Sequence, residues 1–200
     1  MLRLLALPIL LALALPAVAG KYNPTLSVGD VGPAWEALPG VDDKPLAFDD
    51  LKEAKVVVLA FTCNTCPYAV DAEKRLVALA KTFADDPVRL VAINCNRGDR
   101  DSLDAMQARA KEAGFGFAYL KDDAGVGKAY GALRTPEFVV LDAERKVVYL
   151  GALDDDPDGK AVTKRYVEEA VRAALANEAP AINETPPIGC LVKYPRDRRR

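Results

Sequence analysis

A cysteine pair at positions 63 and 66 places the strongest constraint on what this chain can fold into. Residues 55–61 form a short apolar run typical of a buried strand, and a helical pattern of apolar residues begins at Cys66. The motif Cys-Asn-Thr-Cys-Pro, residues 63–67, joins the two, and proline is tolerated in the first turn of a helix. Two thiols at this spacing can close a small disulfide ring, and a helix N-terminus favours a thiolate on the first of them, Cys63. The pattern predicts a reversible dithiol/disulfide couple at a strand-to-helix junction.

The chain contains no histidine among its 200 residues. This absence excludes Ser-His and Cys-His catalysis and histidine-ligated metals. It also excludes c-type haem attachment, because Pro67 stands where that motif requires histidine. A four-cysteine zinc site would need a second close pair, and Cys95 and Cys190 are far apart in sequence. We therefore expect no metal and no organic cofactor.

The formal net charge is −2, without a large excess of either sign. A protein that binds nucleic acid through its phosphates usually carries a clear basic excess. We therefore expect no nucleic-acid partner.

The first 19 residues have the pattern of a secretory signal peptide. A positively charged start precedes the apolar residues 4–15, and Ala-Val-Ala at residues 17–19 matches a cleavage site. The apolar run is short for a membrane span and is interrupted by Pro8. We expect cleavage near Ala19 and export to the periplasm or the medium, with an uncleaved anchor as the alternative.

The expected mature chain is one domain, residues 20–194, followed by a basic, solvated tail at residues 195–200. Its first part, residues 20–40, is rich in glycine and proline and reads as an extended lead-in from which Trp35 packs onto the core. Membrane contact is expected only through an uncleaved signal segment or the basic tail.

Apolar patterns along the domain predict alternating strands and helices. Strands are expected at residues 44–47, 55–61, 88–93, 117–120, 138–141 and 147–150. Helices are expected from residue 66 to about residue 83, from a cap at Asp101 or Ser102 to about residue 112, and at residues 124–130 and 162–176. This order predicts an α/β fold whose sheet has parallel and antiparallel parts.

The layout resembles the thioredoxin-like superfamily and, more narrowly, its exported peroxiredoxin-like or redoxin branch. The resemblance is carried by FTCNTCPY at residues 61–68, by AYGA at residues 129–132 with Thr135-Pro136, and by GCLVKY at residues 189–194. It spans residues 26–194. It implies a thioredoxin-like fold, a central mixed sheet flanked by helices, with an N-terminal strand extension and a C-terminal Pro-rich tail.

The resemblance also implies roles for individual residues. Cys63 would attack a partner disulfide, and Cys66 would resolve the mixed disulfide. Pro136 would be a cis-proline facing the dithiol, beside a groove in which backbone groups of Thr135 pair with a bound peptide strand. The implied partners are protein disulfides or dithiols and an electron donor that the sequence does not identify.

The residues that tune the potential of thioredoxins are absent. Thioredoxins carry a buried aspartate six residues before the first cysteine, and this chain has Val57 there. Asn64-Thr65 also replaces the Gly-Pro that separates the thioredoxin cysteines. The direction of electron flow is therefore open.

Two alternatives to disulfide exchange remain. A peroxiredoxin would carry its cysteine in a Pro-x-x-x-Thr-x-x-Cys frame. Counting back from Cys66 places Cys63 at the Thr position and Leu59 at the Pro position. Counting back from Cys63 places Ala60 and Val56 there, so neither cysteine fits the frame. A non-catalytic binding module with an inert dithiol is the second alternative.

The remaining cysteines allow several interpretations. A small buried hydrophobic residue is the default for Cys95. Cys190 lies after a Pro-rich segment, where an exposed free thiol would be reactive outside the cytosol. We propose a Cys95–Cys190 disulfide that pins the tail, and a relay of electrons from Cys190 to the dithiol is the functional variant.

Overall fold

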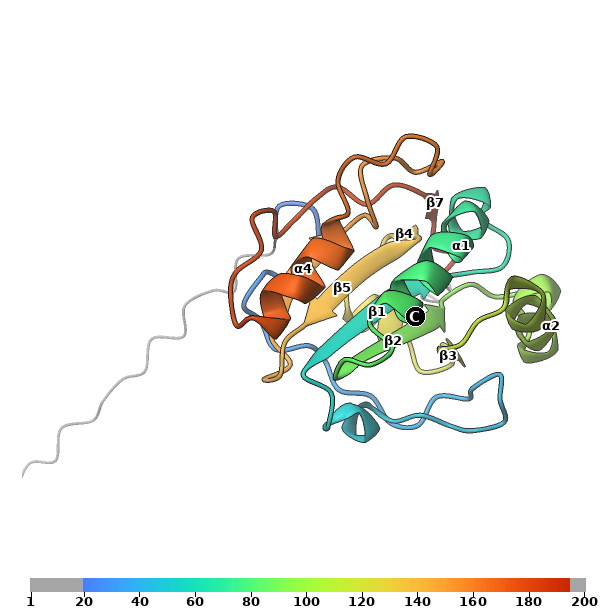
Figure 1. The fold of residues 1–200 in the computed structure, drawn as a ribbon. Coiled ribbons are helices and arrows are strands. Elements are labelled where there is room, and N and C mark those ends of the chain that lie inside the picture. Colours follow the sequence, from blue (N-terminus) through green and yellow to red (C-terminus); the bar gives the residue numbers. More distant parts are fainter. Residues whose placement is uncertain (1–19, 195–200) are drawn as a thin grey trace, which may run out of the picture.

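The computed structural model describes residues 20–194; the expected signal segment, residues 1–19, and the basic tail, residues 195–200, lie outside the described residues. A five-stranded sheet with the order β3-β2-β1-β5-β6 forms the centre (Figure 1). Its strands are β1 (Val56–Thr62), β2 (Val88–Asn94), β3 (Ala118–Lys121), β5 (Glu137–Leu141) and β6 (Val147–Gly151). The pairs β1–β2 and β2–β3 are parallel, whereas β1–β5 and β5–β6 are antiparallel. The predicted mixed α/β sheet is confirmed.

Helices cover both faces of this sheet. They are α1 (Pro67–Thr82), α2 (Leu103–Ala113), α3 (Val126–Ala129) and α4 (Tyr166–Leu175), with short 3-10 turns η1 (Phe48–Leu51) and η2 (Asp99–Asp101). Figure 1 shows α1 and α4 side by side over one face. In the described part of the chain, no helix combines the length and apolar character that crossing a membrane requires.

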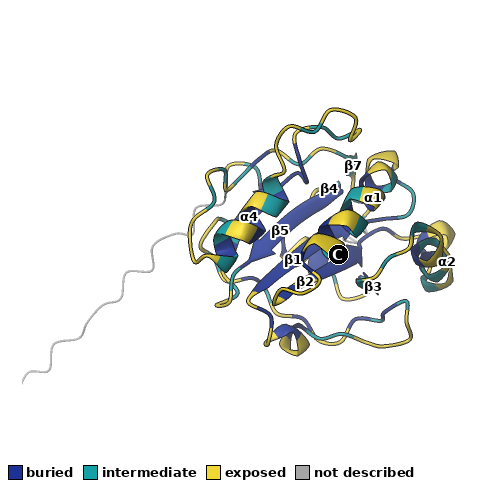
Figure 2. Ribbon diagram, viewed as in Figure 1, coloured by how far each residue is buried: buried dark blue, intermediate teal, exposed yellow. Residues whose placement is uncertain are grey.

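The central strand β1 is buried along its whole length, as Figure 2 shows for the sheet in general. Alternate side chains of a strand point to opposite faces. Val58 and Ala60 accordingly join the core beneath α1 and α4, whereas Val57 and Leu59 join the opposite core. Trp35 lies in this second core, as predicted, with its ring 4.7 Å from that of Phe48. A strand buried on both faces explains the continuous apolar run in the sequence.

The N-terminal part of the domain differs from the prediction. The expected strand at residues 44–47, and with it the strand extension, is wrong: among the described residues this region contributes isolated bridges, including Leu38–Leu46 and Gly40–Leu120. Leu38 and Leu46 exchange two backbone hydrogen bonds at 3.0 Å, but a turn from Gly40 to Asp43 on one side and η1 on the other leave no room for a longer ladder.

The last helix also begins later than expected. Asp155 accepts hydrogen bonds from the backbone N–H groups of Thr163 and Lys164, both at 2.9 Å. These bonds hold the segment in a turn, because a side chain that binds nearby backbone groups competes with helix formation. The helix α4 therefore starts at Tyr166 rather than near residue 162.

Two short strands were not predicted. β4 (Arg134–Thr135) pairs antiparallel with β7 (Cys190–Leu191), which ends the Pro-rich C-terminal segment (Figure 1). Before this strand the segment runs beside β6, where Thr185 N–H donates to the Leu150 carbonyl at 3.0 Å. The segment thereby connects β6, at one edge of the sheet, with the N-terminal end of α1.

Candidate active site

The cysteine pair lies where β1 ends and α1 begins. Cys63 directly follows β1, and Cys66 is the N-cap of α1, whose first residue is Pro67. Both cysteines are only 2% exposed. Burial of two thiols in this position leaves their reactivity to be set by the few groups that contact them.

Thr135 contacts both sulfurs from the opposite side of the site. Its hydroxyl lies 3.4 Å from Cys63 Sγ, and its carbonyl oxygen accepts from the Cys66 thiol at 2.9 Å. The Thr135–Pro136 peptide bond is cis, as predicted. The fold thus brings together Cys63, Cys66 and Thr135, which the sequence analysis singled out from two distant segments.

Cys66 holds the negative charge of the reduced pair more readily than Cys63. The hydrogen bond from Cys63 lowers the pKa of Cys66 to about 4, against the opposing effect of burial. The Cys190 thiol and the backbone N–H groups of Ala69 and Cys190 act in the same direction. The same hydrogen bond between the two cysteines, followed by burial, raises the pKa of Cys63.

This arrangement differs from the sequence prediction of a thiolate on Cys63. The reason is that the hydrogen bond from Cys63 is the largest effect on the pKa of Cys66, and the Cys190 thiol adds to it. When the proton passes from Cys63 to Cys66, the new Cys66 thiol has the Thr135 carbonyl as its acceptor. A single proton is therefore held by either Cys63 or Cys66 in the reduced pair.

The reduced protein is expected to carry a thiolate far below the ordinary thiol range. An unperturbed cysteine titrates near pH 8.5. The ultraviolet absorbance of the thiolate should instead appear near pH 4, because the pKa of Cys66 is lowered to about 4. Cys63→Ala should raise this midpoint, since it removes the largest stabilising contact, whereas Cys95→Ala should leave it unchanged. A first ionisation at the ordinary value would contradict this prediction.

The two residues between the cysteines are held by the buried carboxylate of Asp101, which is 2% exposed. Its oxygens accept from Asn64 N–H at 2.8 Å, from the Thr65 hydroxyl at 3.1 Å and from Asn94 Nδ2 at 3.1 Å. Thr65 Oγ1 also lies 3.8 Å from Cys63 Sγ. Asp101 therefore fixes the turn that carries the dithiol. The Thr65 hydroxyl lies between its carboxylate and the Cys63 sulfur.

Further polar side chains complete this network. Tyr119 donates to Asn64 Oδ1 at 2.8 Å, and Asn96 Nδ2 donates to Thr65 Oγ1 at 3.3 Å. Asn94 ends β2, the strand next to β1, and Asn96 follows it, and the carboxyl ends of neighbouring parallel strands meet at one edge of a sheet. That position could have identified both asparagines from the sequence. Asp101 gave no such signal, because the sequence offered it only as a helix cap, a role that Ser102 fills.

Glu137 is a second buried carboxyl beside the site, 2% exposed at the start of β5. It accepts from the backbone N–H groups of Leu133 at 2.8 Å and Arg134 at 3.1 Å. Burial raises the pKa of Glu137 to about 7, although both hydrogen bonds oppose the shift. Glu137 thus anchors the strand β4 that contacts the cysteines.

This raised pKa predicts a stability that falls with pH. Between about pH 4.5 and pH 7 the folded protein keeps the Glu137 proton that the unfolded chain has released, so the stabilisation is complete below about pH 4.5 and is lost as pH rises to about 7. The size is about 3 kcal/mol, since each pKa unit corresponds to about 1.4 kcal/mol. Urea unfolding at pH 5 and at pH 8 measures the loss. Between these pH values the free energy of unfolding of Glu137→Gln should fall by about this amount less than that of the wild type. The exposed Glu178→Gln should behave as the wild type does, and an unchanged slope in Glu137→Gln would refute the assignment.

Cys190 also reaches the site, but Cys95 does not. Cys190 N–H lies 3.4 Å from Cys66 Sγ, and Cys190 packs against the cluster of Cys63, Cys66 and Ala69. Cys95 is buried on the other face of the sheet, where it packs against Gly127, Tyr194 and Asp122. The proposed Cys95–Cys190 disulfide is therefore wrong: all four cysteines are free, and these two have different neighbours.

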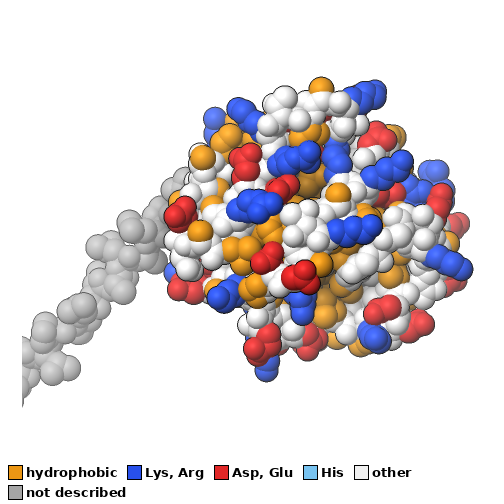
Figure 3. All heavy atoms as spheres, in the orientation of Figure 1, with side chains coloured by type: hydrophobic (Ala, Val, Ile, Leu, Met, Phe, Trp, Pro, Cys, Tyr) orange, Lys and Arg blue, Asp and Glu red, His pale blue; other side chains and the backbone are white. Residues whose placement is uncertain are grey.

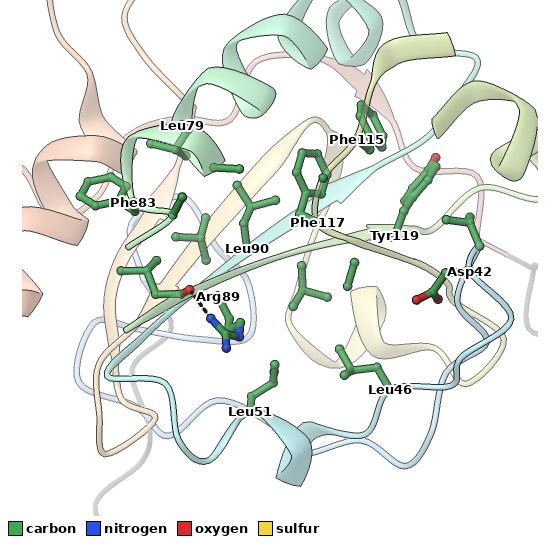
Figure 4. A pocket seen from close by; sticks show the side chains of 18 of the residues that line it. Asp42, Leu46, Leu51, Leu79, Phe83, Arg89, Leu90, Phe115, Phe117 and Tyr119 are labelled. Carbon is green, nitrogen blue, oxygen red and sulfur yellow. Dashed lines mark hydrogen bonds between the residues drawn. The ribbon is translucent and has the colours of Figure 1, made fainter. Parts of the chain in front are cut away.

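A cavity of ≈ 660 Å³ lies elsewhere in the molecule (Figure 4). Apolar side chains from the end of α1 and from the start of β2 and β3 surround it, among them Leu79, Phe83, Leu90 and Phe117. No cysteine lines it. The candidate site is therefore the buried dithiol and not this cavity.

Comparisons with known proteins agree with the overall fold. The model of the AhpC/TSA family matches residues 28–150. A search of curated proteins gave no match.

Solved structures show the same fold over most of the chain. A hypothetical protein from Sinorhizobium meliloti 1021 is 32% identical, with a TM-score of 0.81, covering 88% of this chain and 98% of that one. An uncharacterized conserved protein from Geobacillus kaustophilus is 34% identical, with a TM-score of 0.81, covering 92% and 100%. A thiol:disulfide interchange protein of the thioredoxin family from Chlorobium tepidum TLS is 19% identical, with a TM-score of 0.59, covering 76% and 99%, and shows likeness of fold alone.

Proposed function

The chain belongs to the AhpC/TSA family of thioredoxin-fold oxidoreductases, and on this basis we propose that it exchanges electrons with protein disulfides through the Cys63–Cys66 dithiol. One observation carries the proposal. The two buried thiols share a proton, and Thr135 offers a hydroxyl to Cys63 and a carbonyl to Cys66. Such a pair carries a thiolate in its reduced form, as disulfide exchange requires.

The proposed first step is an attack by Cys63. Its proton passes to Cys66, the Cys63–substrate bond forms, the substrate disulfide breaks, and the released substrate thiolate takes a proton from solvent. Cys66 then gives up its proton and attacks Cys63, which forms the Cys63–Cys66 disulfide and releases the second substrate thiol. Two electrons have then passed from the protein to the substrate.

The reverse reaction uses the same groups. A thiol that attacks Cys63 in the Cys63–Cys66 disulfide releases Cys66, and a thiol of low pKa is a good leaving group. Stabilisation of the Cys66 thiolate favours the reduced form of the pair. The potential is therefore expected to be less reducing than the roughly −270 mV of thioredoxin.

Exposed apolar side chains around the site support a protein as the partner. Tyr68, Leu133, Ile188 and Leu191 are between 38% and 65% exposed, and they come from the segments that frame the dithiol. Tyr68 and Ile188 line one small pocket together with Pro136. On the face seen in Figure 3, charges of both signs are interspersed with apolar atoms. Apolar contact of this kind is typical of binding to another protein.

The proposed compartment is outside the cytosol, where substrate disulfides persist. The expected signal segment, residues 1–19, supports it. Cell fractionation and N-terminal sequencing of the mature protein would test it.

A redox titration of the mature protein against glutathione and dithiothreitol tests the proposed function, with Cys63→Ser as the control. We expect the dithiol to equilibrate and to give one two-electron midpoint. A dithiol that does not equilibrate would leave only a non-catalytic binding module.

Peroxide reduction is the second candidate, and one contact favours it. Neither cysteine has a threonine three residues before it, where the peroxiredoxin frame requires one, but the fold brings the Thr135 hydroxyl to 3.4 Å from Cys63 Sγ. Rapid hydroperoxide consumption that Cys63→Ser abolishes would support this activity over disulfide exchange.

A further inference from the structure

The groove expected to receive a peptide strand is filled by the chain's own C-terminal segment. Thr135 pairs with Cys190, and Arg134 pairs with Leu191. The Arg134 guanidinium also donates to the Gly189 carbonyl at 2.8 Å. A Cβ atom at Gly189 would lie 2.0 Å from the Thr135 carbonyl oxygen, so only glycine allows this approach. We call residues 189–191 the strap.

The strap places a third thiol against the dithiol. Cys190 N–H points to Cys66 Sγ at 3.4 Å, and Cys190 packs against the cluster formed by Cys63, Cys66 and Ala69. Cys66 also contacts Cys63, so one sulfur has two thiol neighbours. An antiparallel pairing with Thr135 sets a cysteine in the position that a substrate cysteine would occupy.

We propose that Cys190 is a third redox thiol, which forms a disulfide with Cys66. The proposal rests on the proposed function. In the oxidised protein the Cys190 thiolate attacks Cys66, the Cys66–Cys190 bond forms, the Cys63–Cys66 bond breaks, and Cys63 leaves as a thiolate that takes up the proton lost by Cys190. The number of disulfides does not change, so this step needs no other oxidant or reductant.

This transfer moves the disulfide to a more accessible place. Cys63 and Cys66 are 2% exposed, whereas Cys190 is half-buried and its neighbour Leu191 is 65% exposed. A two-residue strand has few hydrogen bonds and opens at low cost. A protein dithiol that donates electrons can therefore attack Cys190 in the strap, while a reduced Cys63 is already free for the next substrate.

The test replaces Cys63 and determines which cysteine then forms a disulfide with Cys66. Reduced Cys63→Ser is oxidised with one equivalent of the thiol oxidant diamide and is digested with trypsin without reduction. Cleavage after lysine and arginine gives one peptide with Cys66, residues 56–74, and another with Cys190, residues 173–193. We expect these two peptides to be disulfide-linked in most of the monomeric protein.

Matched variants keep the result interpretable. The link should persist in Cys63→Ser/Cys95→Ala and disappear in Cys63→Ser/Cys190→Ser. Circular dichroism checks the fold of each variant, and Cys63→Ala serves as a second form should the serine variant be misfolded. Only intermolecular dimers, or a free Cys190 in a folded variant, would overturn the proposal.

Failure of this proposal can be told from failure of the proposed function. If the wild-type dithiol equilibrates with glutathione but the folded Cys63→Ser variant shows no Cys66–Cys190 link, the third thiol is refuted and disulfide exchange stands. If the wild-type dithiol does not equilibrate, disulfide exchange is refuted, and the relay that rests on it is refuted with it.

Discussion

Replacing Cys63 with serine is expected to lower the rate of protein disulfide exchange by more than about 1,000-fold, because the attacking sulfur is lost. A serine hydroxyl at this position can still contact Thr135, so the fold should persist. The rate of reduction of a disulfide-bonded test protein, with dithiothreitol as the final donor, provides the measurement.

Two further variants make this prediction specific. Cys95→Ala should keep the wild-type rate, since Cys95 packs on the other face of the sheet. Cys66→Ser should block turnover and accumulate a mixed disulfide between Cys63 and the substrate, because the resolving thiol is missing. A mixed disulfide that forms through Cys66 in Cys63→Ser, and not through Cys63, would reverse the proposed roles.

Replacing Asp101 with alanine is expected to lower the free energy of unfolding of the reduced protein by about 3 kcal/mol. The substitution leaves the donors Asn64 N–H, Thr65 Oγ1 and Asn94 Nδ2 without their acceptor, and each unpaired buried group costs about 1–3 kcal/mol. Asn94 retains a contact with Tyr119, and Asn64 is partly exposed. The total loss of stability should therefore stay well below the sum of the costs of three fully buried, unpaired donors. Urea unfolding measures the change.

Asp99→Ala is the matched control for this substitution. Asp99 lies in the same turn, η2, and is exposed, so its loss should change stability by less than about 0.5 kcal/mol. Asp101→Ala should in addition slow alkylation of the dithiol, since the Asn64-Thr65 turn loses its anchor. Equal effects of the two substitutions would show that Asp101 does not hold the turn.

The central sheet could be predicted because its signals are local. The run at residues 55–61 is apolar without interruption, and β1 is indeed the strand buried on both faces. The hairpin β5–β6 likewise follows from two apolar runs separated by a polar turn. The strand at residues 44–47 was wrong because turns on both sides of Leu46 limit its pairing with Leu38 to one bridge, and β4 and β7 were missed because two-residue strands carry no periodicity.

The candidate site was predictable only where a motif marks it. Cys63 and Cys66 stand out by their spacing, and Thr135-Pro136 by resemblance to a known fold. Asp101 comes from a 3-10 turn that lies 35 residues or more further along the chain than the turn it holds. In the sequence, Glu137 is a single polar residue at the start of an apolar strand, with no sign of its role in holding β4. No sequence pattern connects such contacts, because they depend on which loops meet at the end of the sheet.

The sequence by itself determined the α/β order of elements and the position of a cysteine pair after a buried strand, and its lack of histidine excluded histidine-based catalysis. The tertiary structure decided how that dithiol is controlled. The start of α1 at Pro67 makes Cys66 the N-cap residue of this helix, and the strap brings Cys190 against the same sulfur. Residue types and spacing follow from covalent order, whereas the charge on a sulfur depends on the groups within a few ångströms of it, which only folding brings together.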